Sequence, residues 1–420
     1  MGSAGSGGAG RGGAGRGVNL LGLRSHNTAL VLDLLRTAGA GGISRLELAE
    51  RSRLTPQAVS KITARLREEG LAEEAGRRAS TGGKPRTVLR LVPEAGYAVG
   101  VHLDRDELRA VLVDLRGAVV AERRAGIDLG AGAEAVLSAV AALVEALVGG
   151  SGGVSVGVSV GVSRDASAGV SVRGGGFAVD GAGVSGAGVP GVGVLGVGVA
   201  LPGPLDHVRG VLHRVTGFPE WDGFPLRDAL ARRLGVPVVV DKDTNAAALG
   251  LALGGEGDSP GGEGGSFAYL HLGTGLGAGL VIGGTVHRGA RTGAGEFGHQ
   301  VIQLDGPPCG CGDRGCVEAL CLAAVARGDL REAARVLGAG AGNLVGLLDI
   351  DLVLLGGRTV AASPEPFVRG VAAVLAARAR REGAPEGAVP VRLAGGGERV
   401  VAEGAAQLLL APLFGRAAAG

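Results

Sequence analysis

Residues 293–299 read GAGEFGH, and a second short stretch, CGCGDRGCVE, follows at residues 309–318. They contain one histidine and three cysteines in the spacing His-x9-Cys-x-Cys-x4-Cys. The candidate metal ligands are His299, Cys309, Cys311 and Cys316. Three thiolates and one imidazole are a common ligand set for a tetrahedral structural zinc ion, so the spacing predicts such a site. The alternative is a group of free thiols beside an unrelated histidine.

The chain on both sides of this stretch alternates apolar strands, helices and glycine turns. Strands are expected at 97–103 and 108–115, within 194–204, at 237–241 and within 267–284. Helices are expected at 133–148, from Thr244 onward, and in the segment 343–357, which runs on into a strand. Such alternation is typical of an α/β fold in which helices cover the sheets. We therefore predict an α/β body after about residue 92.

The first ninety residues have a different pattern. Amphipathic helices are expected at 26–38, 44–52 and 55–69, followed by a two-stranded wing over 71–91. Ser44 and Glu47 have the spacing of a capping box, and Thr55 precedes Pro56 as an N-cap precedes the first helical residue. Three short helices followed by a hairpin predict a winged helix-turn-helix.

Charge supports a nucleic-acid-binding role for this segment. Residues 1–90 carry 15 Lys and Arg against 7 Asp and Glu, and the remaining residues carry 27 against 33. A basic segment on an acidic body is typical of a DNA-binding head; the alternatives are a solvated basic tail or a protein-binding domain. The candidate DNA contacts are Gln57, Ser60 and Lys61 for base edges, and Arg65, Lys84 and Arg86 for phosphates or the minor groove. One small head binds DNA weakly, so we expect a homodimer or higher homo-oligomer on an inverted-repeat operator.

Glycine, with 84 residues, is concentrated at the N-terminus and around residues 150–198. The expected division of the chain is a disordered tail at 1–18, the winged helix at 19–91, a first lobe at 92–260 with a Gly/Val/Ser-rich insertion at about 150–195, and a second lobe at 261–420. The most apolar stretch is interrupted by glycine and by Pro190, which does not suit a membrane helix. The cysteine usage and the absence of a secretory signal predict a cytoplasmic protein without membrane contact.

At the metal-binding stretch the chain resembles the ROK family, which groups repressors, open reading frames and sugar kinases. Further segments resemble that family in the same order: LPGPLD at 201–206, FPEWDGFPLRDAL at 218–230, DKDTNAAAL at 241–249, HLGTGLGAGLVIGG at 271–284 and LLGGR at 354–358. With a winged helix in front, the chain is similar to the repressor branch, which includes xylose repressors. The resemblance implies a two-lobed, actin-like ATPase fold of the ribonuclease-H-like type, with sugar bound between the lobes.

The resemblance also implies roles for single residues. Asp243 occupies the position of the kinases' catalytic base, and Asn245 lies in the same element. Glu296, His299 and Glu318 match residues that hydrogen-bond sugar hydroxyls, and His299 would also bind the zinc ion. These five residues are the candidate ligand-binding site for a sugar or sugar derivative.

Two departures from the family pattern concern the chemistry. Where kinases of the family have a DxGGT-type phosphate loop, His102 replaces the carboxylate, and Asp104 and Arg105 replace both glycines. Glycine permits the close backbone approach that phosphates need, so we expect no use of ATP and no catalytic residue. Lys242 replaces an asparagine that often contacts sugar. It is consistent with a changed sugar preference, with an acidic or phosphorylated ligand, or with a solvent-facing side chain.

These observations predict a sugar-responsive transcriptional repressor whose kinase-like body acts as a sensor. One alternative is an active, glucokinase-like sugar kinase that carries a DNA-binding head. Another is a constitutive DNA-binding protein that has lost its effector site. The broken phosphate loop argues against the first alternative, and Glu296, His299 and Glu318 argue against the second.

Overall fold

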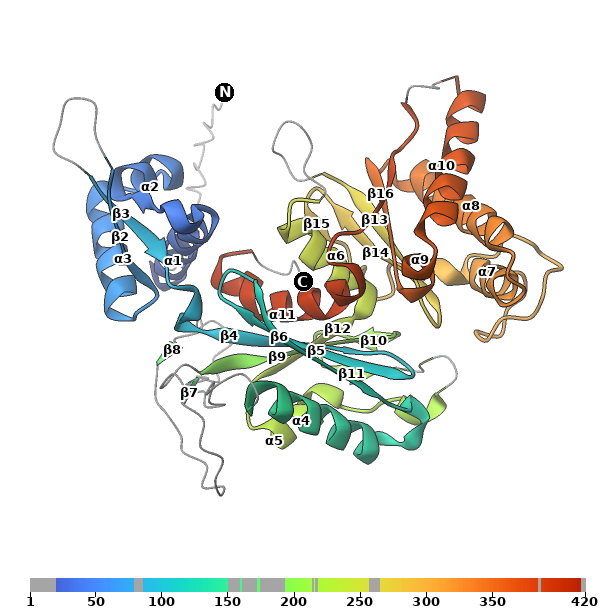
Figure 1. Ribbon diagram of the computed structural model, residues 1–420, viewed down its shortest axis with the longest axis horizontal. Helices are drawn as coiled ribbons and strands as arrows, with labels where there is room; N and C mark the ends of the chain where they lie inside the picture. The colour runs from blue at the N-terminus through green and yellow to red at the C-terminus, as the bar shows by residue number, and fades with distance from the viewer. Residues whose placement is uncertain are drawn as a thin grey trace, which may run out of the picture.

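The computed structural model describes residues 20–78, 86–149, 159–160, 172–173, 193–213, 215, 218–256, 265–383 and 387–416. A small N-terminal head lies beside a body with two five-stranded sheets (Figure 1). The α/β class predicted from the sequence is confirmed. The expected tail at 1–18 and nearly all of the insertion at 150–195 lie outside the described residues. Among the described helices, none has the length and apolar character needed to cross a bilayer.

The head contains three helices and a three-stranded antiparallel sheet of order β1-β3-β2. Its elements are α1 (Leu20–Thr37), α2 (Arg45–Ser52), α3 (Pro56–Glu68), β1 (Ile43–Ser44), β2 (Ala72–Arg78) and β3 (Arg86–Leu91), with a 3-10 turn at Gly39–Gly41. This is the predicted winged helix-turn-helix arrangement, although α1 begins earlier than expected and β1 was not foreseen.

Local capping explains where the second and third helices begin. The Ser44 hydroxyl accepts a hydrogen bond from the Glu47 amide at 3.3 Å, and the Glu47 carboxylate accepts one from the Ser44 amide at 2.8 Å. The Thr55 hydroxyl accepts from the Ala58 amide at 3.2 Å, with Pro56 in the first helical position. Both expected caps are confirmed, and each satisfies amides that a helix start leaves without a partner.

The first lobe is built on a sheet of order β12-β9-β4-β5-β6. Its strands are β4 (Tyr97–Leu103), β5 (Glu107–Asp114), β6 (Val119–Gly126), β9 (Val194–Leu201) and β12 (Val238–Lys242). Helices α4 (Ala133–Gly149) and α5 (Leu226–Leu234) cover one face of it (Figure 1). Short elements complete the lobe: β7 (Ser159–Val160), β8 (Val172–Arg173), β10 (Leu205–Asp206), β11 (Val211–Leu212), and 3-10 turns at Pro93–Ala95, Leu129–Ala131 and Pro219–Trp221.

The second lobe repeats this topology with the order β15-β14-β13-β16-β17. Its strands are β13 (Phe267–Leu272), β14 (Leu276–Ile282), β15 (Thr285–Val286), β16 (Leu352–Gly356) and β17 (Val391–Leu393). Its helices are α7 (Val317–Ala326), α8 (Leu330–Leu348), α9 (Arg358–Ala362) and α10 (Pro364–Arg381), with 3-10 turns at Phe297–His299 and Gly397–Arg399. In each lobe three antiparallel strands are followed by two that pair in parallel on the other side of the first strand. The repeat agrees with the expected two-lobed fold.

Two helices, α6 (Asp243–Leu253) and α11 (Val400–Leu413), lie between the two sheets (Figure 1). The C-terminal helix α11 returns to the first lobe, where it packs directly on β4 and β9. A Cβ atom on Gly100 or Gly198 would overlap a carbonyl oxygen of α11, and one on Gly404 would overlap the Ala246 carbonyl of α6. Glycine at these three positions therefore allows helix and sheet, and the two helices, to approach closely.

The C-terminal end of α11 contacts the head. Arg36 of α1 lies 4.9 Å from the centre of the Phe414 ring, and Arg416 forms an ion pair with Asp33 at 3.2 Å. Apolar residues of the head, of β4 and β5, and of α11 belong to one continuous buried cluster. The head is thus packed onto the body.

Candidate functional site

A cavity lies between the lobes, and small-molecule sites are often found at such an interface between two domains. The charged and polar side chains that line it come from both lobes: Asp104, Arg105, Lys242, Asp243, Thr244, His271, Thr274, Glu296, His299 and Glu318. Four of the five predicted ligand-binding residues are therefore brought together here. Their roles stay predictions.

Asp243 is the first residue of α6 and lines the cavity. Its carboxylate accepts a hydrogen bond from the Thr244 amide at 2.6 Å. Burial, with a further contribution from the nearby Asp104 and Glu296 carboxylates, raises the pKa of Asp243 to about 7. The group can therefore accept or donate a hydrogen bond near neutral pH, which is useful toward a ligand hydroxyl.

Lys242 points into the cavity. Its ammonium group forms an ion pair with Glu296 at 2.6 Å and donates to the Ala294 carbonyl at 2.9 Å, and only 4% of its side chain is exposed. The hypothesis of a solvent-facing lysine is therefore wrong. A local sequence pattern could not show this, because the partner carboxylate lies 54 positions away on the other lobe.

Glu318 and His299 approach the cavity from the second lobe. Glu318, in the first turn of α7, accepts a hydrogen bond from the Leu276 amide at 2.8 Å. His299 ends a short 3-10 turn, and its Nδ1 lies 3.7 Å from the sulfur of Cys309. His299 therefore belongs to both the cavity wall and the cysteine cluster.

Asn245 is placed differently from the other candidates. It is fully buried, and its amide donates to the Asp241 carboxylate at 3.0 Å. Asp241 also forms a buried ion pair with Arg288 at 2.7 Å. Among the described residues, those that line the cavity do not include Asn245. Asn245 therefore stabilises the junction between β12 and α6.

His299, Cys309, Cys311 and Cys316 form a cluster that could hold a metal ion, with all ligand atoms within 4.8 Å of one another. The sulfurs of Cys311 and Cys316 are 3.8 Å apart, about the separation that a tetrahedral zinc site with Zn–S bonds near 2.3 Å requires. Burial and the neighbouring sulfurs raise the pKa of Cys316 to about 12. Thiolates at this position therefore need a cation.

Glycines shape the loop that carries these cysteines. The Cys309 amide donates to the Asp313 carbonyl at 2.8 Å, and the Gly312 amide donates to the Cys309 carbonyl at 3.0 Å. Gly315 has a φ of +66°, and a Cβ there would overlap the Gln303 carbonyl. The fourth cysteine, Cys321, is buried on α7, outside the cluster.

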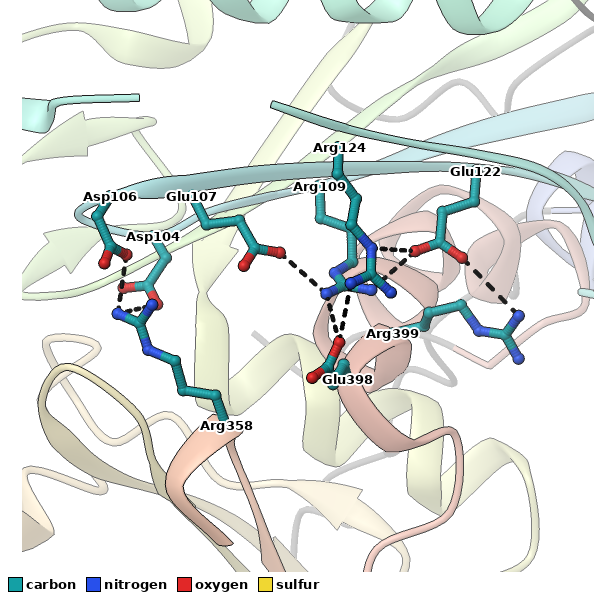
Figure 2. A network of polar contacts seen from close by, with 9 residues as sticks. All are labelled: Asp104, Asp106, Glu107, Arg109, Glu122, Arg124, Arg358, Glu398 and Arg399. Atoms are coloured by element: carbon teal, nitrogen blue, oxygen red, sulfur yellow. Dashed lines mark hydrogen bonds and ion pairs between the residues drawn. The ribbon is translucent and has the colours of Figure 1, made fainter. Parts of the chain in front are cut away.

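The His102–Asp106 segment is tied to the second lobe by polar contacts. Figure 2 shows Arg358 of α9 reaching the carboxylates of Asp106, at 2.8 Å, and Asp104, at 3.7 Å. The other Asp104 oxygen accepts from the Thr274 hydroxyl at 2.9 Å. Sequence reasoning missed these residues as partners, because the contacts join segments 170 and 252 positions apart.

A second, smaller cavity lies beside the contacts of Arg358 with Asp104 and Asp106. It is lined by the carboxylates of Asp104, Glu107 and Glu398 and by two histidines. Burial lowers the pKa of His102 to about 3 and also lowers the pKa of His271, so both imidazoles are neutral near pH 7.

The arginines beside this cavity are neutralised by acids. Arg109, only 3% exposed, forms ion pairs with Glu107, Glu122 and Glu398 at 2.7–2.9 Å (Figure 2). Arg124 shares two of these carboxylates. The network joins β5 and β6 to the 3-10 turn that precedes α11.

The candidate DNA contacts of α3 lie on one open face of the head. Gln57, Ser60, Lys61 and Arg65 are all exposed, whereas Val59, Thr63 and Leu66 of the same helix are buried. Arg65 forms an ion pair with Glu69 at 2.7 Å. In the wing, Arg86 is exposed and Lys84 lies outside the described residues.

Asp243→Asn is expected to stabilise the protein at pH 8 by up to about 4 kcal/mol, and to change its stability little near pH 4. The folded-state pKa of about 7 exceeds the ordinary value of 3.8. Above pH 4 the unfolded chain therefore loses this proton more readily than the folded chain, and wild-type stability falls until about pH 7. Asparagine has no such proton.

Urea denaturation of both proteins at pH 5 and pH 8 measures this difference. A free-energy difference between variant and wild type that is equal at the two pH values would contradict the raised pKa.

Part of the sequence matches a known protein family. Residues 189–325 match the sequence profile of the ROK family. A xylose repressor of Caldicellulosiruptor bescii is 27% identical over 276 residues, covering 66% of this chain and 59% of the relative. A glucokinase of Thermotoga maritima is 41% identical over 135 residues, covering 32% of this chain and 41% of the relative. The chain thus matches only 59% and 41% of the lengths of these two curated relatives.

A solved structure shares the fold along nearly the whole chain. A ROK family transcriptional regulator, a homolog of the E. coli MLC protein, has a TM-score of 0.67 at 20% identity. The alignment covers 94% of this chain and 98% of the regulator. At this identity the likeness shows the fold alone.

Proposed function

This chain carries a ROK family domain, and from that premise we propose that it is a DNA-binding transcriptional repressor that responds to a sugar or sugar derivative. The winged helix binds the operator, and the cavity between the lobes binds the effector. The repressor acts in the cytoplasm as a homodimer or higher homo-oligomer, because two heads are needed to read an inverted repeat.

The side chains of the cavity support a polyhydroxylated ligand. Asp243, Glu296 and Glu318 supply acceptors for hydroxyl groups, and Lys242 supplies a donor beside Glu296. A few convergent polar groups in a cavity between two lobes are typical of small-molecule sites. Since the lining comes from both lobes, a ligand that contacts both favours the closed arrangement.

The position of α11 is the main observation that supports a link between the ligand cavity and the head. At its N-terminal end Val400 and Val401 line the second cavity, while Phe414 and Arg416 at the other end contact the head. Its middle packs against α6, which begins with Asp243 in the ligand cavity. A shift of α6 on ligand binding would therefore move α11 and, with it, the head.

The contacts around the His102–Asp106 segment support a sensor without kinase activity. Asp104 and Asp106 are engaged by Thr274 and Arg358. The phosphates of a nucleotide would have to displace these contacts and would then face carboxylates. Each such like-charge approach is unfavourable at short range.

We further propose that the cysteine cluster binds one structural zinc ion. His299, Cys309, Cys311 and Cys316 provide four protein ligands, which leave no open position for a substrate. Through His299 the metal would fix the loop that carries Glu296 at the cavity wall.

The DNA-binding part of the proposal predicts two classes of variant. Gln57→Ala and Lys61→Ala are expected to weaken operator binding by about 1–3 kcal/mol and to affect random DNA less, because these exposed residues begin the recognition helix. Arg86→Ala is expected to weaken both and to reduce the salt dependence of binding by about one unit, as the loss of one phosphate contact would.

Fluorescence anisotropy with operator and random duplexes at several salt concentrations separates these classes. Arg123→Ala removes an exposed arginine of β6, outside the head, and serves as the charge-matched control. Equal losses on operator and random DNA for Lys61→Ala would contradict its assignment to the groove.

A further inference from the structure

The two cationic side chains that line the ligand cavity have different surroundings. Lys242 is neutralised by Glu296 at 2.6 Å. The guanidinium of Arg105 forms neither an ion pair nor a side-chain hydrogen bond with any residue that the structure describes, and it lies 5.9 Å from the centre of the Phe218 ring. A half-buried guanidinium with this environment lacks the anionic partner that its five donors are suited to bind.

The backbone directs Arg105 toward the cavity. Its amide donates to the Asp104 carboxylate at 2.8 Å, and its carbonyl accepts from the Leu129 amide at 3.0 Å. The side chain reaches from the first lobe to the second, because Nη2 lies 3.6 Å from the place where a Cβ on Gly275 would be. The guanidinium therefore lies beside the Gly273–Gly275 turn and lines the cavity.

Glu318 faces Arg105 without pairing with it. One oxygen of Glu318 lies 3.1 Å from the same Cβ position on Gly275, yet that oxygen is engaged by the Leu276 amide at 2.8 Å. No ion pair between the two groups is found among the described residues. Both groups border the same part of the cavity, beside Gly275.

The carboxylates of the cavity are engaged elsewhere. Glu296 is paired with Lys242, and Asp104 accepts from Thr274. Asp243, with a pKa raised to about 7 by burial, is in part protonated near neutral pH and in that form can donate to an anion. Arg105 is therefore the cation of this cavity that remains available to a ligand.

We propose that the effector is a monosaccharide bearing an anionic group, a phosphate or a carboxylate, and that Arg105 selects it. The inference rests on the proposed function, since it names the ligand class of the same cavity. The hydroxyls of the ligand face Glu296 and Glu318, and its anionic group faces Arg105. Arginine binds phosphate and carboxylate through paired charge-assisted hydrogen bonds, which are stronger than those to a neutral hydroxyl.

Isothermal titration of the whole 420-residue chain tests this selection. The probes are glucose, N-acetylglucosamine and xylose, each beside its terminal phosphate ester, together with glucuronate and inorganic phosphate. We expect at least one anionic sugar to bind on the order of ten-fold more tightly than its neutral parent. The phosphate esters and glucuronate distinguish the two anionic groups.

Two variants test whether Arg105 causes the preference for the anionic sugar over its neutral parent. In Arg105→Ala the affinities for the anionic sugar and its neutral parent should agree within about two-fold. Arg105→Lys should keep part of the difference, because lysine retains the positive charge but lacks the paired donors of the guanidinium. Arg116→Ala removes an exposed arginine at the other end of β5 and should bind like wild type.

The outcomes separate this inference from the proposed function. Neutral sugars that bind as tightly as their anionic forms and still alter operator affinity would overturn the inference alone. An anionic preference that survives in Arg105→Ala, or inorganic phosphate that binds as tightly as any sugar phosphate, would also overturn it. If no sugar of either kind binds, both fail.

Discussion

Cys316→Ser is expected to abolish zinc binding and to lower the stability of the second lobe sharply. Cys316 is fully buried and immediately precedes α7. Structural zinc contributes roughly 10–16 kcal/mol of binding free energy in small zinc domains. Even part of that sum is comparable with the net stability of a whole domain, about 5–15 kcal/mol. Elemental analysis of the purified protein, with thermal unfolding, measures both effects.

Cys321→Ala is the matched control for this variant. Cys321 is also a buried cysteine of the second lobe, but its sulfur donates to the Ala333 carbonyl at 3.5 Å, away from the cluster. It should retain one zinc per chain. A wild-type protein without zinc, or a Cys316→Ser variant with unchanged zinc content, would contradict the metal assignment.

The purified protein is expected to give no sugar-dependent ATP turnover above background, where kinases typically turn over at about 1–100 s⁻¹. The reason is the segment from His102 to Asp106. Its carboxylates are tied to Thr274 and Arg358. His102, which is neutral near pH 7, occupies the position that the family resemblance assigns to a carboxylate in the kinases.

A coupled assay with pentoses, hexoses and N-acetylated amino sugars measures turnover, and calorimetry with ATP and magnesium measures binding. An active glucokinase in the same assay shows that turnover would be detected. Saturable phosphorylation of any sugar well above background would contradict the proposal of a sensor without kinase activity. It would favour an active sugar kinase that carries a DNA-binding head.

Features that depend on neighbouring residues could be predicted from the sequence. The caps at Ser44 and Thr55 form between residues three positions apart. The cysteine cluster has three of its ligands within eight positions, in turn-rich sequence. In each case the sequence separation itself limits the possible geometry.

Strand β6, Val119–Gly126, was not predicted. It contains Glu122, Arg123 and Arg124, and it is half-exposed along its length, so it lacks the apolar pattern of a buried strand. It forms because β5 offers a free edge, and its charged residues are stabilised by Arg109 and Glu398. Those partners are supplied by the tertiary fold.

Side-chain direction in the cavity also depends on distant segments. Lys242 turns inward because Glu296 and the Ala294 carbonyl lie opposite. Asn245 turns away because Asp241 offers an acceptor four positions earlier. The role of α11 could not be read from its sequence, because its position depends on close approach to Gly100 and Gly198 of the first sheet.

The central claim is that ligand binding between the lobes changes the affinity of the head for DNA. Operator affinity should be measured with and without the tightest-binding sugar found by calorimetry, for wild type, Glu296→Ala and Asp243→Asn. Coupling between two sites typically amounts to about 1–3 kcal/mol, or roughly 5–150-fold in affinity. Asp243→Asn should be at least as stable as wild type at pH 8, so a lost response in this variant cannot be explained by unfolding.

Glu220→Ala removes an exposed glutamate outside the cavity and should respond like wild type. We expect the ligand to change the operator affinity of the wild type by roughly 5–150-fold. Glu296→Ala and Asp243→Asn should bind the operator equally well with and without the ligand. Operator affinity that is unchanged by every bound sugar, or a full response in both variants, would contradict the account.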